Sequence, residues 1–439
     1  MVKGRMKLFT QCLSAAVVSL TSVVVLAHDM VPGKPQSQPI LLANADLYTV
    51  TQGVLPNTDL LFQHGKIVKI AANLDENPQN LPENTQVIDA SGKQVYPGLL
   101  AMVTHVGLVE VEAVRATNDI REISLANPDL RAHVAFNTDS EIIPTLRSNG
   151  ITHVQVYPDG KLLLGQSSLM NMDGWNWEDA LTQASTGLHV KWPSAAVIKA
   201  WWMSQTPEAQ RKASMKMRTQ LNDFMQAAHA YYESNQANLT QKKDSRWHGM
   251  LPIFSGQRDV YVHANDRRDI EDSIAFFSTY GIKPIIVGGM DAWQIADYLA
   301  ANEISVVYTA AYGIPERDGE AFDMAYKGAA ILREAQVNTA IAINSSWAVR
   351  DLPFAAGMSV NFGLSKAEAL RAITLAPAEI MGVADRLGSL EEGKSATVVI
   401  SSGDILDFAT HQIEAMYIDG RLVDLNNRHR QLYNKYSQH

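Results

Sequence analysis

Two kinds of hydrophobic pattern divide the chain. Between residues 40 and 95, short apolar runs alternate with turns such as His64-Gly65, which is typical of short β-strands. From residue 260 to 343, apolar runs of strand length alternate with segments of helical period, which indicates parallel strands joined by helices. Short strands are predicted again at 397–400 and 415–418. The pattern therefore predicts a small β-domain built from both ends of the chain, with an α/β domain between them.

A long helix is predicted after residue 206. Thr206 can cap it, Pro207 suits the first helical position, and apolar residues recur on one face from Ala213 to Ala228. This helix interrupts the alternation of strands and helices, either as a lid over a site or as a packed excursion. Its amphipathic pattern favours the packed excursion.

The first 27 residues have the features of a secretory signal. Basic residues occupy positions 3, 5 and 7, an apolar run follows from 13 to 26, and Ala27 ends an acceptable cleavage site. A membrane anchor is the alternative, but the run is shorter than the roughly 20 apolar residues that span a bilayer. We therefore expect export to the periplasm, with His28 as the mature N-terminus and no membrane span after cleavage.

Composition narrows the classes of function. The formal net charge is -9, so nucleic acid is not expected as a partner. Cys12, the one cysteine of the chain, lies inside the expected signal, which leaves the exported protein without disulfides or thiol catalysis. We expect the partner to be a small-molecule ligand or substrate.

The stretch VYPGLLAMVTHVGL, residues 95–108, has the form of a metal-binding strand that lacks one ligand. A strand that binds a metal through two histidines carries them two positions apart, because alternate residues of a strand face the same way. His105 is present, but Val103 stands two residues before it. The stretch raises the question of whether metal chemistry survives in this chain.

Three stretches together resemble the amidohydrolase superfamily, and in particular its imidazolonepropionase-like, exported members. The first is GKIVKIAANL followed by VIDASGKQVYPGLL, residues 65–100. The second is VYVHAND, residues 260–266, and the third runs from AITLAPAEIMGVADRLGSLEEGKSATVVI at 372–400 to YIDGRLV at 417–423. The resemblance implies an α/β fold: a (β/α)₈ TIM-type barrel with a composite β-sandwich formed by the N- and C-terminal segments.

The residue patterns and the resemblance together predict the domain boundaries. These are a signal peptide at 1–27, the first part of the β-sandwich at 28–97, the barrel at 98–384, the second part of the sandwich at 385–424 and a polar tail at 425–439. Members of the superfamily hold one or two divalent metals at the C-terminal mouth of the barrel, where a bound water is activated. The implied ligands are a His-x-His on the first strand, a His on the fifth and on the sixth, and an Asp on the eighth. A carboxylated Lys or a Glu from the fourth strand often completes the set.

Two of the implied ligands are present. His105 matches the second histidine of the first strand, and His263 matches the fifth-strand ligand. Val103 replaces the first histidine, and the sixth-strand run at 285–290 contains none.

The remaining positions offer substitutes. Asn344 or Ser345 stands where the eighth strand should carry its Asp, and Lys191 is a candidate for the fourth-strand ligand. Asn265, just after His263, is a further candidate pocket residue. Catalytic zinc usually keeps three protein ligands, so His105 and His263 alone would make a weak site. One divalent ion such as zinc and a metal-free site are equally compatible with these residues.

The leading hypothesis is an exported amidohydrolase-type hydrolase that acts on non-peptide carbon–nitrogen bonds with an incomplete set of metal ligands. A non-catalytic binding protein that keeps the scaffold is the alternative. A structural partner in an envelope complex is a third possibility.

Overall fold

The computed structural model describes residues 30–74, 76, 78–240, 242–315, 317 and 319–438. The expected signal peptide and the cleavage site before His28 lie outside these residues. Among the helices that are described, none combines the length and apolar character needed to span a bilayer.

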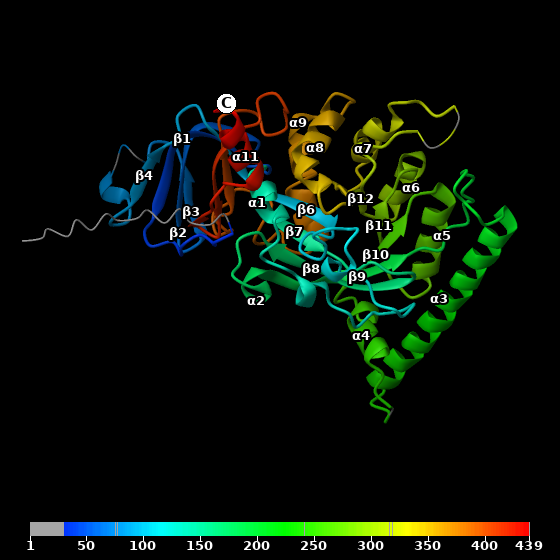
Figure 1. The fold of residues 1–439 in the computed structure, drawn as a ribbon. Coiled ribbons are helices and arrows are strands. Elements are labelled where there is room, and N and C mark those ends of the chain that lie inside the picture. The colour runs from blue at the N-terminus through cyan, green and yellow to red at the C-terminus, as the bar shows by residue number, and fades with distance from the viewer. Residues whose placement is uncertain are drawn as a thin grey trace, which may run out of the picture.

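The two ends of the chain form one β-sheet, shown by the blue and red strands in Figure 1. Its strands are β1 (Ile40–Tyr48), β2 (Val54–Gln63), β3 (Lys66–Ala71), β4 (Gln86–Asp89), β5 (Gln94–Pro97), β14 (Val398–Ser401), β15 (Ile413–Ile418) and β16 (Arg421–Leu422). The ends meet where β5 pairs antiparallel with β14, with Tyr96 opposite Val399. This pairing confirms the predicted β-domain of both termini, as a single hydrogen-bonded sheet.

The middle of the chain forms a nearly closed barrel of eight strands. They are β6 (Leu99–Thr104), β7 (Ile151–Val156), β8 (Leu163–Asn171), β9 (Leu181–Lys191), β10 (Asp259–Ala264), β11 (Ile285–Gly288), β12 (Val306–Tyr308) and β13 (Thr339–Ile341), adjacent in chain order. Between β13 and β6 the chain around residues 372–373 bridges the gap. Ile341 N donates to Ala372 O and Leu100 N donates to Ile373 O, both at 2.9 Å. The predicted barrel is therefore confirmed.

One strand departs from the expected parallel order. β8 runs antiparallel to both β7 and β9. Only residues 157–162 connect β7 to β8, and a parallel connection needs a dozen or more residues. The third strand–helix unit of the barrel is thus replaced by a hairpin.

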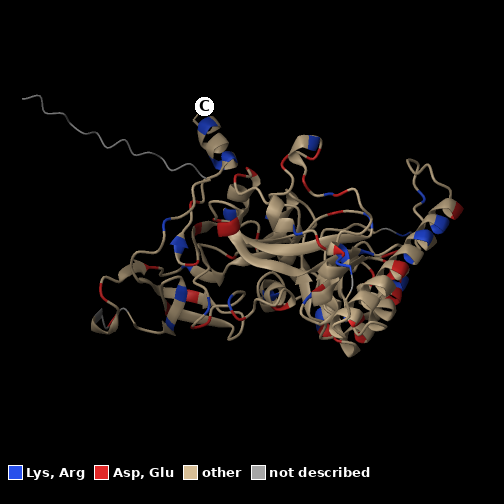
Figure 2. Cartoon of the chain, turned by 90° about the horizontal axis from the view of Figure 1, so that it is seen from below, with Lys and Arg blue, Asp and Glu red and all other residues tan. Residues whose placement is uncertain are grey.

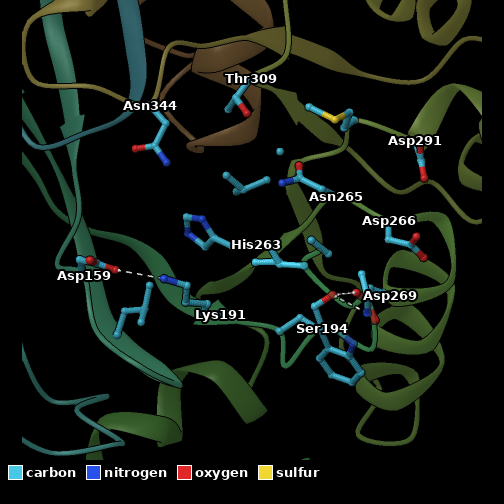
Figure 3. Close-up of a pocket in the computed structure, with 18 of the residues that line it drawn as sticks. Asp159, Lys191, Ser194, His263, Asn265, Asp266, Asp269, Asp291, Thr309 and Asn344 are labelled. Atoms are coloured by element: carbon cyan, nitrogen blue, oxygen red, sulfur yellow. Dashed lines mark hydrogen bonds and ion pairs between the residues drawn. The ribbon is translucent and has the colours of Figure 1, made fainter. Parts of the chain in front are cut away.

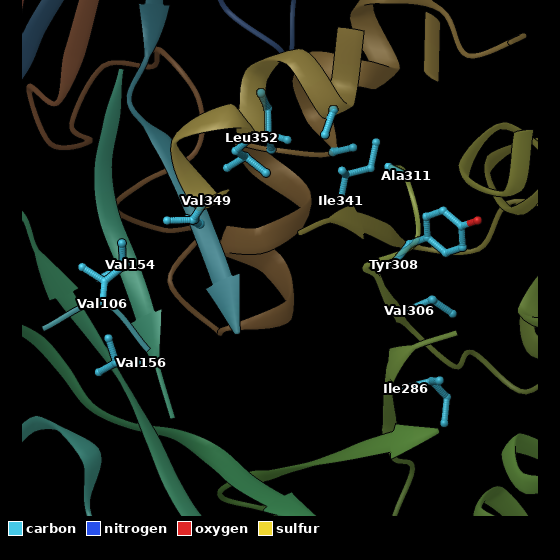
Figure 4. Close-up of a cluster of buried hydrophobic side chains, with 14 of the residues drawn as sticks. Val106, Val154, Val156, Ile286, Val306, Tyr308, Ala311, Ile341, Val349 and Leu352 are labelled. Atoms are coloured by element: carbon cyan, nitrogen blue, oxygen red, sulfur yellow. The ribbon is translucent and has the colours of Figure 1, made fainter. Parts of the chain in front are cut away.

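Alternate residues of the strands face opposite layers of the core. Ile286, Val306 and Tyr308 pack outward against the helices (Figure 4), whereas Val287 and Val307 belong to a second cluster inside the barrel. This alternation follows from the two-residue period of a strand. It decides which side chains reach the barrel interior.

Helices and 3₁₀ turns connect and follow these strands. They are α1 (Ile142–Arg147), α2 (Trp177–Ala180), α3 (Pro207–Gln236), α4 (Ser245–Phe254), α5 (Arg267–Ser278), α6 (Ala296–Ala301), α7 (Met324–Glu334), α8 (Leu352–Val360), α9 (Lys366–Arg371), α10 (Leu375–Ile380) and α11 (Arg428–Tyr436), with 3₁₀ turns at Pro78–Asn80, Arg115–Thr117, Ala132–Ala135, Ala292–Ile295 and Ala348–Asp351. The predicted cap of α3 is confirmed, since Thr206 accepts from Ala209 N. Ser365 caps α9 in the same way by accepting from Glu368 N.

The long helix α3 packs against α4 beside the barrel (Figure 1). Its buried residues, Leu221, Met225, Ala228 and Tyr231, lie between its middle and its C-terminal end. Arg218, near its middle, forms an ion pair with Asp269 at the start of α5 at 2.9 Å. These contacts agree with the packed excursion, which also supports one wall of the barrel mouth.

The expected polar tail contains a helix that the sequence reading did not identify. Asn427 caps α11 by accepting from Arg430 N at 2.9 Å. Leu425 and Asn427 are buried and anchor the start of the helix, whereas α11 itself has no buried residue.

Candidate functional site

A cavity of about 820 Å³ opens at the end of the barrel where the parallel strands have their carboxyl ends. Residues that end or follow β6, β7 and β9–β13 line it (Figure 3). All six sequence-predicted site residues line this cavity: His105, Lys191, His263, Asn265, Asn344 and Ser345. The structure therefore brings together residues that are up to 240 positions apart in the sequence.

Strand geometry places these side chains. Lys191 is the last residue of β9, and His263 is the penultimate residue of β10, on the same inward face as Tyr261. Asn344 and Ser345 follow the end of β13 by a few residues. Asp351, the next carboxylate along the chain, lines a different cavity beside α8.

The ring of Tyr157 lies among three histidine rings, and the sequence did not identify it as a site residue. Its ring centroid lies 4.5 Å from that of His105, 4.7 Å from that of His189 and 5.1 Å from that of His263. Its hydroxyl donates to Asn344 Oδ1 at 3.0 Å. A tyrosine directly after the apolar strand β7 was the available signal, because such a position lies at the barrel mouth.

His189 is a second residue that the sequence reading did not assign to the site. It precedes Lys191 by two positions on β9, so it faces inward one layer deeper. Its Nδ1 lies 2.9 Å from Nε2 of His263, within a hydrogen bond in which one ring donates and the other accepts. Its ring also stacks on Tyr261, with centroids 4.6 Å apart.

Burial keeps the three imidazoles neutral. It lowers the pKa of His105 to about 4 and that of His263 to about 3, and it lowers the pKa of His189 well below its usual value. Burial also raises the pKa of Tyr157, so its hydroxyl remains a hydrogen-bond donor at neutral pH. The centre of the site is thus an uncharged cluster of stacked rings.

Charged side chains around this cluster are held in ion pairs. Lys191 Nζ lies 3.8 Å from Asp159 Oδ1, and Asp159 Oδ2 also contacts Arg121 at 2.6 Å (Figure 3 shows the first pair). On the opposite wall, Arg317 contacts both carboxylate oxygens of Asp291. These pairs fix the polar rim around the neutral rings.

Comparisons with known proteins agree with this architecture. Residues 340–424 match the model of the Amidohydrolase family Amidohydro_3. Amidohydrolase tasK of Hapsidospora irregularis is 20% identical over 82% of this chain. A dihydroorotase of Bacillus cytotoxicus is 43% identical over 58 residues. A crystal structure of an amidohydrolase from Thermotoga maritima superposes with a TM-score of 0.77 at 22% identity, over 88% of this chain and 99% of that one. Part of the chain thus matches an amidohydrolase family model, and its fold is similar to that of amidohydrolase structures.

Other solved amidohydrolase-like structures share the fold at lower similarity. A prolidase in complex with N-methylphosphonate-L-proline superposes with a TM-score of 0.55 and 16% identity, over 88% of this chain and 100% of that one. A zinc-bound adenosine deaminase from Xanthomonas campestris superposes with a TM-score of 0.51 at 15% identity, over 92% of this chain and 98% of that one. Identities this low establish the fold alone. The chain spans 39% of the length of tasK and 12% of that of the dihydroorotase.

The residues at the barrel mouth do not fit the metal centre expected of an amidohydrolase. Among the described residues, no group of three or more His, Cys, Asp or Glu side chains could hold a metal ion. Nε2 of His263 is engaged by His189, and the Tyr157 ring packs against both His105 and His263. Asn344, which accepts from the Tyr157 hydroxyl, is an amide where the resemblance implies a carboxylate.

The first barrel strand also deviates from the expected geometry. Val103 has a φ of 50°, which is a strained conformation for a β-branched residue. Met102 and Val103 both belong to the interior cluster, so the strict alternation predicted between Val103 and His105 is wrong here. His105 follows the end of β6 at Thr104 and lines the cavity from the turn beyond the strand.

Proposed function

We propose that this amidohydrolase-superfamily protein binds a small polar molecule at the barrel mouth without the metal-dependent hydrolysis of its relatives. The observation that carries this proposal is the Tyr157 ring, which packs among His105, His189 and His263 and bonds Asn344 through its hydroxyl. The remaining cavity has the size of a small-ligand site, for which about 300–1,000 Å³ is usual. Polar groups from several strands converge on it, as in specific ligand pockets.

The second candidate is hydrolysis of a non-peptide carbon–nitrogen bond. One observation favours it: Nε2 of His105 is buried and has no hydrogen-bond partner among the described residues. A buried nitrogen in this state is destabilising unless a bound molecule or ion satisfies it. A substrate that supplied this partner would lie against Tyr157 and His263.

Metal content separates the two candidates. We expect the purified protein to carry well under one equivalent of zinc by elemental analysis, because too few ligands converge on one point. The matched control is the double variant Tyr157→Gly/Asn344→Asp, which removes the central ring and places a carboxylate at the barrel mouth. It should bind more zinc than the natural chain in a calorimetric titration. Stoichiometric zinc in the natural protein, together with turnover of amide substrates, would instead support the hydrolase.

Ligand binding is tested by thermal stabilisation against a panel of small amides, dipeptides and nucleobases. A ligand at 100 times its Kd stabilises the folded state by about 2.7 kcal/mol, which raises the Tm measurably. The double variant Lys191→Ala/Asn344→Ala should lose the rise in Tm for any ligand that occupies the cavity. A panel in which no compound raises the Tm, while one is hydrolysed, would contradict the binding role.

Export to the periplasm is the remaining part of the proposal. It is supported by the basic start, the apolar run and the Ala27 boundary of the sequence. We expect N-terminal sequencing of the protein from a periplasmic extract to begin at or near His28. A chain that starts at Met1 and sediments with membranes would contradict export with cleavage.

A further inference from the structure

The C-terminal helix α11 extends from the body of the molecule (Figure 2), and nothing in the described chain covers it. Within its own chain it meets α1 and the ring of Trp347, which lies 6.3 Å from that of His429. A nine-residue helix is only marginally stable in water by itself. Because α11 buries none of its residues, packing against a second surface would stabilise it.

The sequence of α11 is that of a basic amphipathic helix. His429, Leu432, Tyr433 and Tyr436 fall at helical spacing on one face, and Tyr433 and Tyr436 are 72% and 63% exposed. Arg428, Arg430 and Lys435 flank this face, and residues 425–439 contain no acidic side chain. The segment is therefore locally cationic in a chain whose net charge is -9.

The same chain carries a surface of opposite character. A groove of about 700 Å³ lies beside α8 and α9 and is closed at one edge by residues 404–408. Its apolar lining includes Phe354 and Phe408, whose rings lie 5.1 Å apart, and Phe408 is 80% exposed. Three carboxylates, those of Asp351, Asp404 and Asp407, line it. Asp404 is paired with Lys366 at 2.6 Å and Asp351 with Arg350 at 3.6 Å, so Asp407 is the carboxylate that the helix would meet first. We call this surface the acidic groove.

We propose that α11 of one molecule docks in the acidic groove of a second copy, which makes the protein a symmetric dimer. The apolar face of the helix would cover Phe354 and Phe408, while Arg428, Arg430 and Lys435 approach the carboxylates of the groove. A two-fold axis forms this contact twice, because each molecule supplies one helix and one groove. Placing an amphipathic helix in an apolar groove is a common mode of protein recognition.

Charge complementarity favours a second copy over a membrane surface. Binding of an amphipathic helix to lipid scales with its buried apolar area, and α11 offers one Leu and two Tyr for this purpose. The net negative charge of the chain also opposes approach to anionic lipid. The acidic groove, in contrast, matches both the apolar and the cationic parts of α11.

The test is the oligomeric state of the full chain by sedimentation velocity over a range of concentrations. We expect a dimer whose Kd rises about tenfold or more when residues 428–439 are deleted, where tenfold equals ~1.4 kcal/mol. This deletion should leave the fold intact, because α11 contains no buried residue. At concentrations where both proteins are monomeric, the deletion variant should have the same circular dichroism spectrum and Tm as the full chain.

A charge exchange makes the test specific. Lys435→Glu on the helix and Asp407→Lys in the groove should each weaken the dimer, and their combination in one chain should restore it. Lys212→Glu, at an exposed position of α3, is the matched control and should have no effect. A monomer at all concentrations, a dimer that survives the deletion, or a double variant that is no better than either single variant would overturn the proposal. Loss of binding to phosphatidylglycerol vesicles on deletion, with a monomeric protein throughout, would overturn it in favour of a membrane.

Discussion

Replacing Asp173 with alanine is expected to destabilise the fold by about 3–5 kcal/mol, because it removes the carboxylate that faces a buried guanidinium. Arg147 and Asp173 have side-chain exposures of 2% and 0%, and Arg147 Nη1 lies 3.3 Å from Asp173 Oδ1. Arg421 Nε lies 3.5 Å from the other oxygen, and Gly33 N donates to both oxygens at 3.1 Å. Burial raises the pKa of Asp173 despite the guanidinium groups, which shows how costly the buried charges are.

This cluster joins parts of the chain that are distant in sequence. Gly33 belongs to the N-terminal segment, Arg147 to α1 of the barrel domain and Arg421 to β16 of the β-domain. Loss of Asp173 should therefore loosen the β-domain from the barrel as well as lower the free energy of unfolding in urea. A second transition in the urea curve would report such uncoupling.

Asp179→Ala is the matched control for this prediction. Asp179 is 42% exposed, and its carboxylate lies 3.9 Å from Arg421 Nη1. Exposed ion pairs contribute about 0–1 kcal/mol, so the control should stay within that range. Equal effects of the two substitutions would contradict a special role for the buried cluster.

The parts of the fold that sequence predicted are those with local patterns. The β-domain of both termini followed from short strands at each end, and β5 and β14 indeed pair across 300 residues. The inward position of His263 followed from strand period, because β10 is regular through Ala264. Asn265, Asn344 and Ser345 line the cavity at the mouth, because the ends of parallel strands share one edge of a barrel.

What the sequence did not predict depends on contacts between distant residues. An apolar run has the same pattern in either direction, so the reversed β8 could not be read from it. The packing of the Tyr157 ring against His105 and His189 brings together residues that are 52 and 32 positions apart. The left-handed conformation of Val103 violates the local preference of valine, and only the surrounding packing can impose it.

The stability of the protein is expected to fall steeply between pH 6.5 and 5, because the histidines of the barrel mouth are buried in their neutral form. Burial lowers the pKa of His105 to about 4 and that of His263 to about 3. It also lowers the pKa of His189 well below its usual value. An unfolded histidine has a pKa near 6.5. Below this value the unfolded chain binds protons that the folded chain does not, so acid favours unfolding.

The sign and size of the effect follow from this difference. A histidine whose folded pKa is depressed contributes its full stability above about pH 6.5 and loses it as the pH falls toward the folded value. Each such group contributes a slope of ~1.4 kcal/mol per pH unit, so the cluster should give between about 3 and 4 kcal/mol per unit near pH 5.5. Urea unfolding at pH 7.5, 6.5, 5.5 and 5 measures this slope above the range in which most carboxylates titrate.

Substitution of one histidine isolates its share of the slope. His263→Gln removes one titrating ring, so the slope between pH 6.5 and 5 should decrease by roughly 1.4 kcal/mol per pH unit, whatever its effect on stability at pH 7.5. Val287→Ala is the control, because this buried cavity residue does not titrate. It should lower stability equally at every pH and leave the slope unchanged. If His263→Gln left the slope unaltered as well, the ring would have to be as easily protonated in the folded chain as in the unfolded one. His263 would then not belong to a neutral cluster around Tyr157.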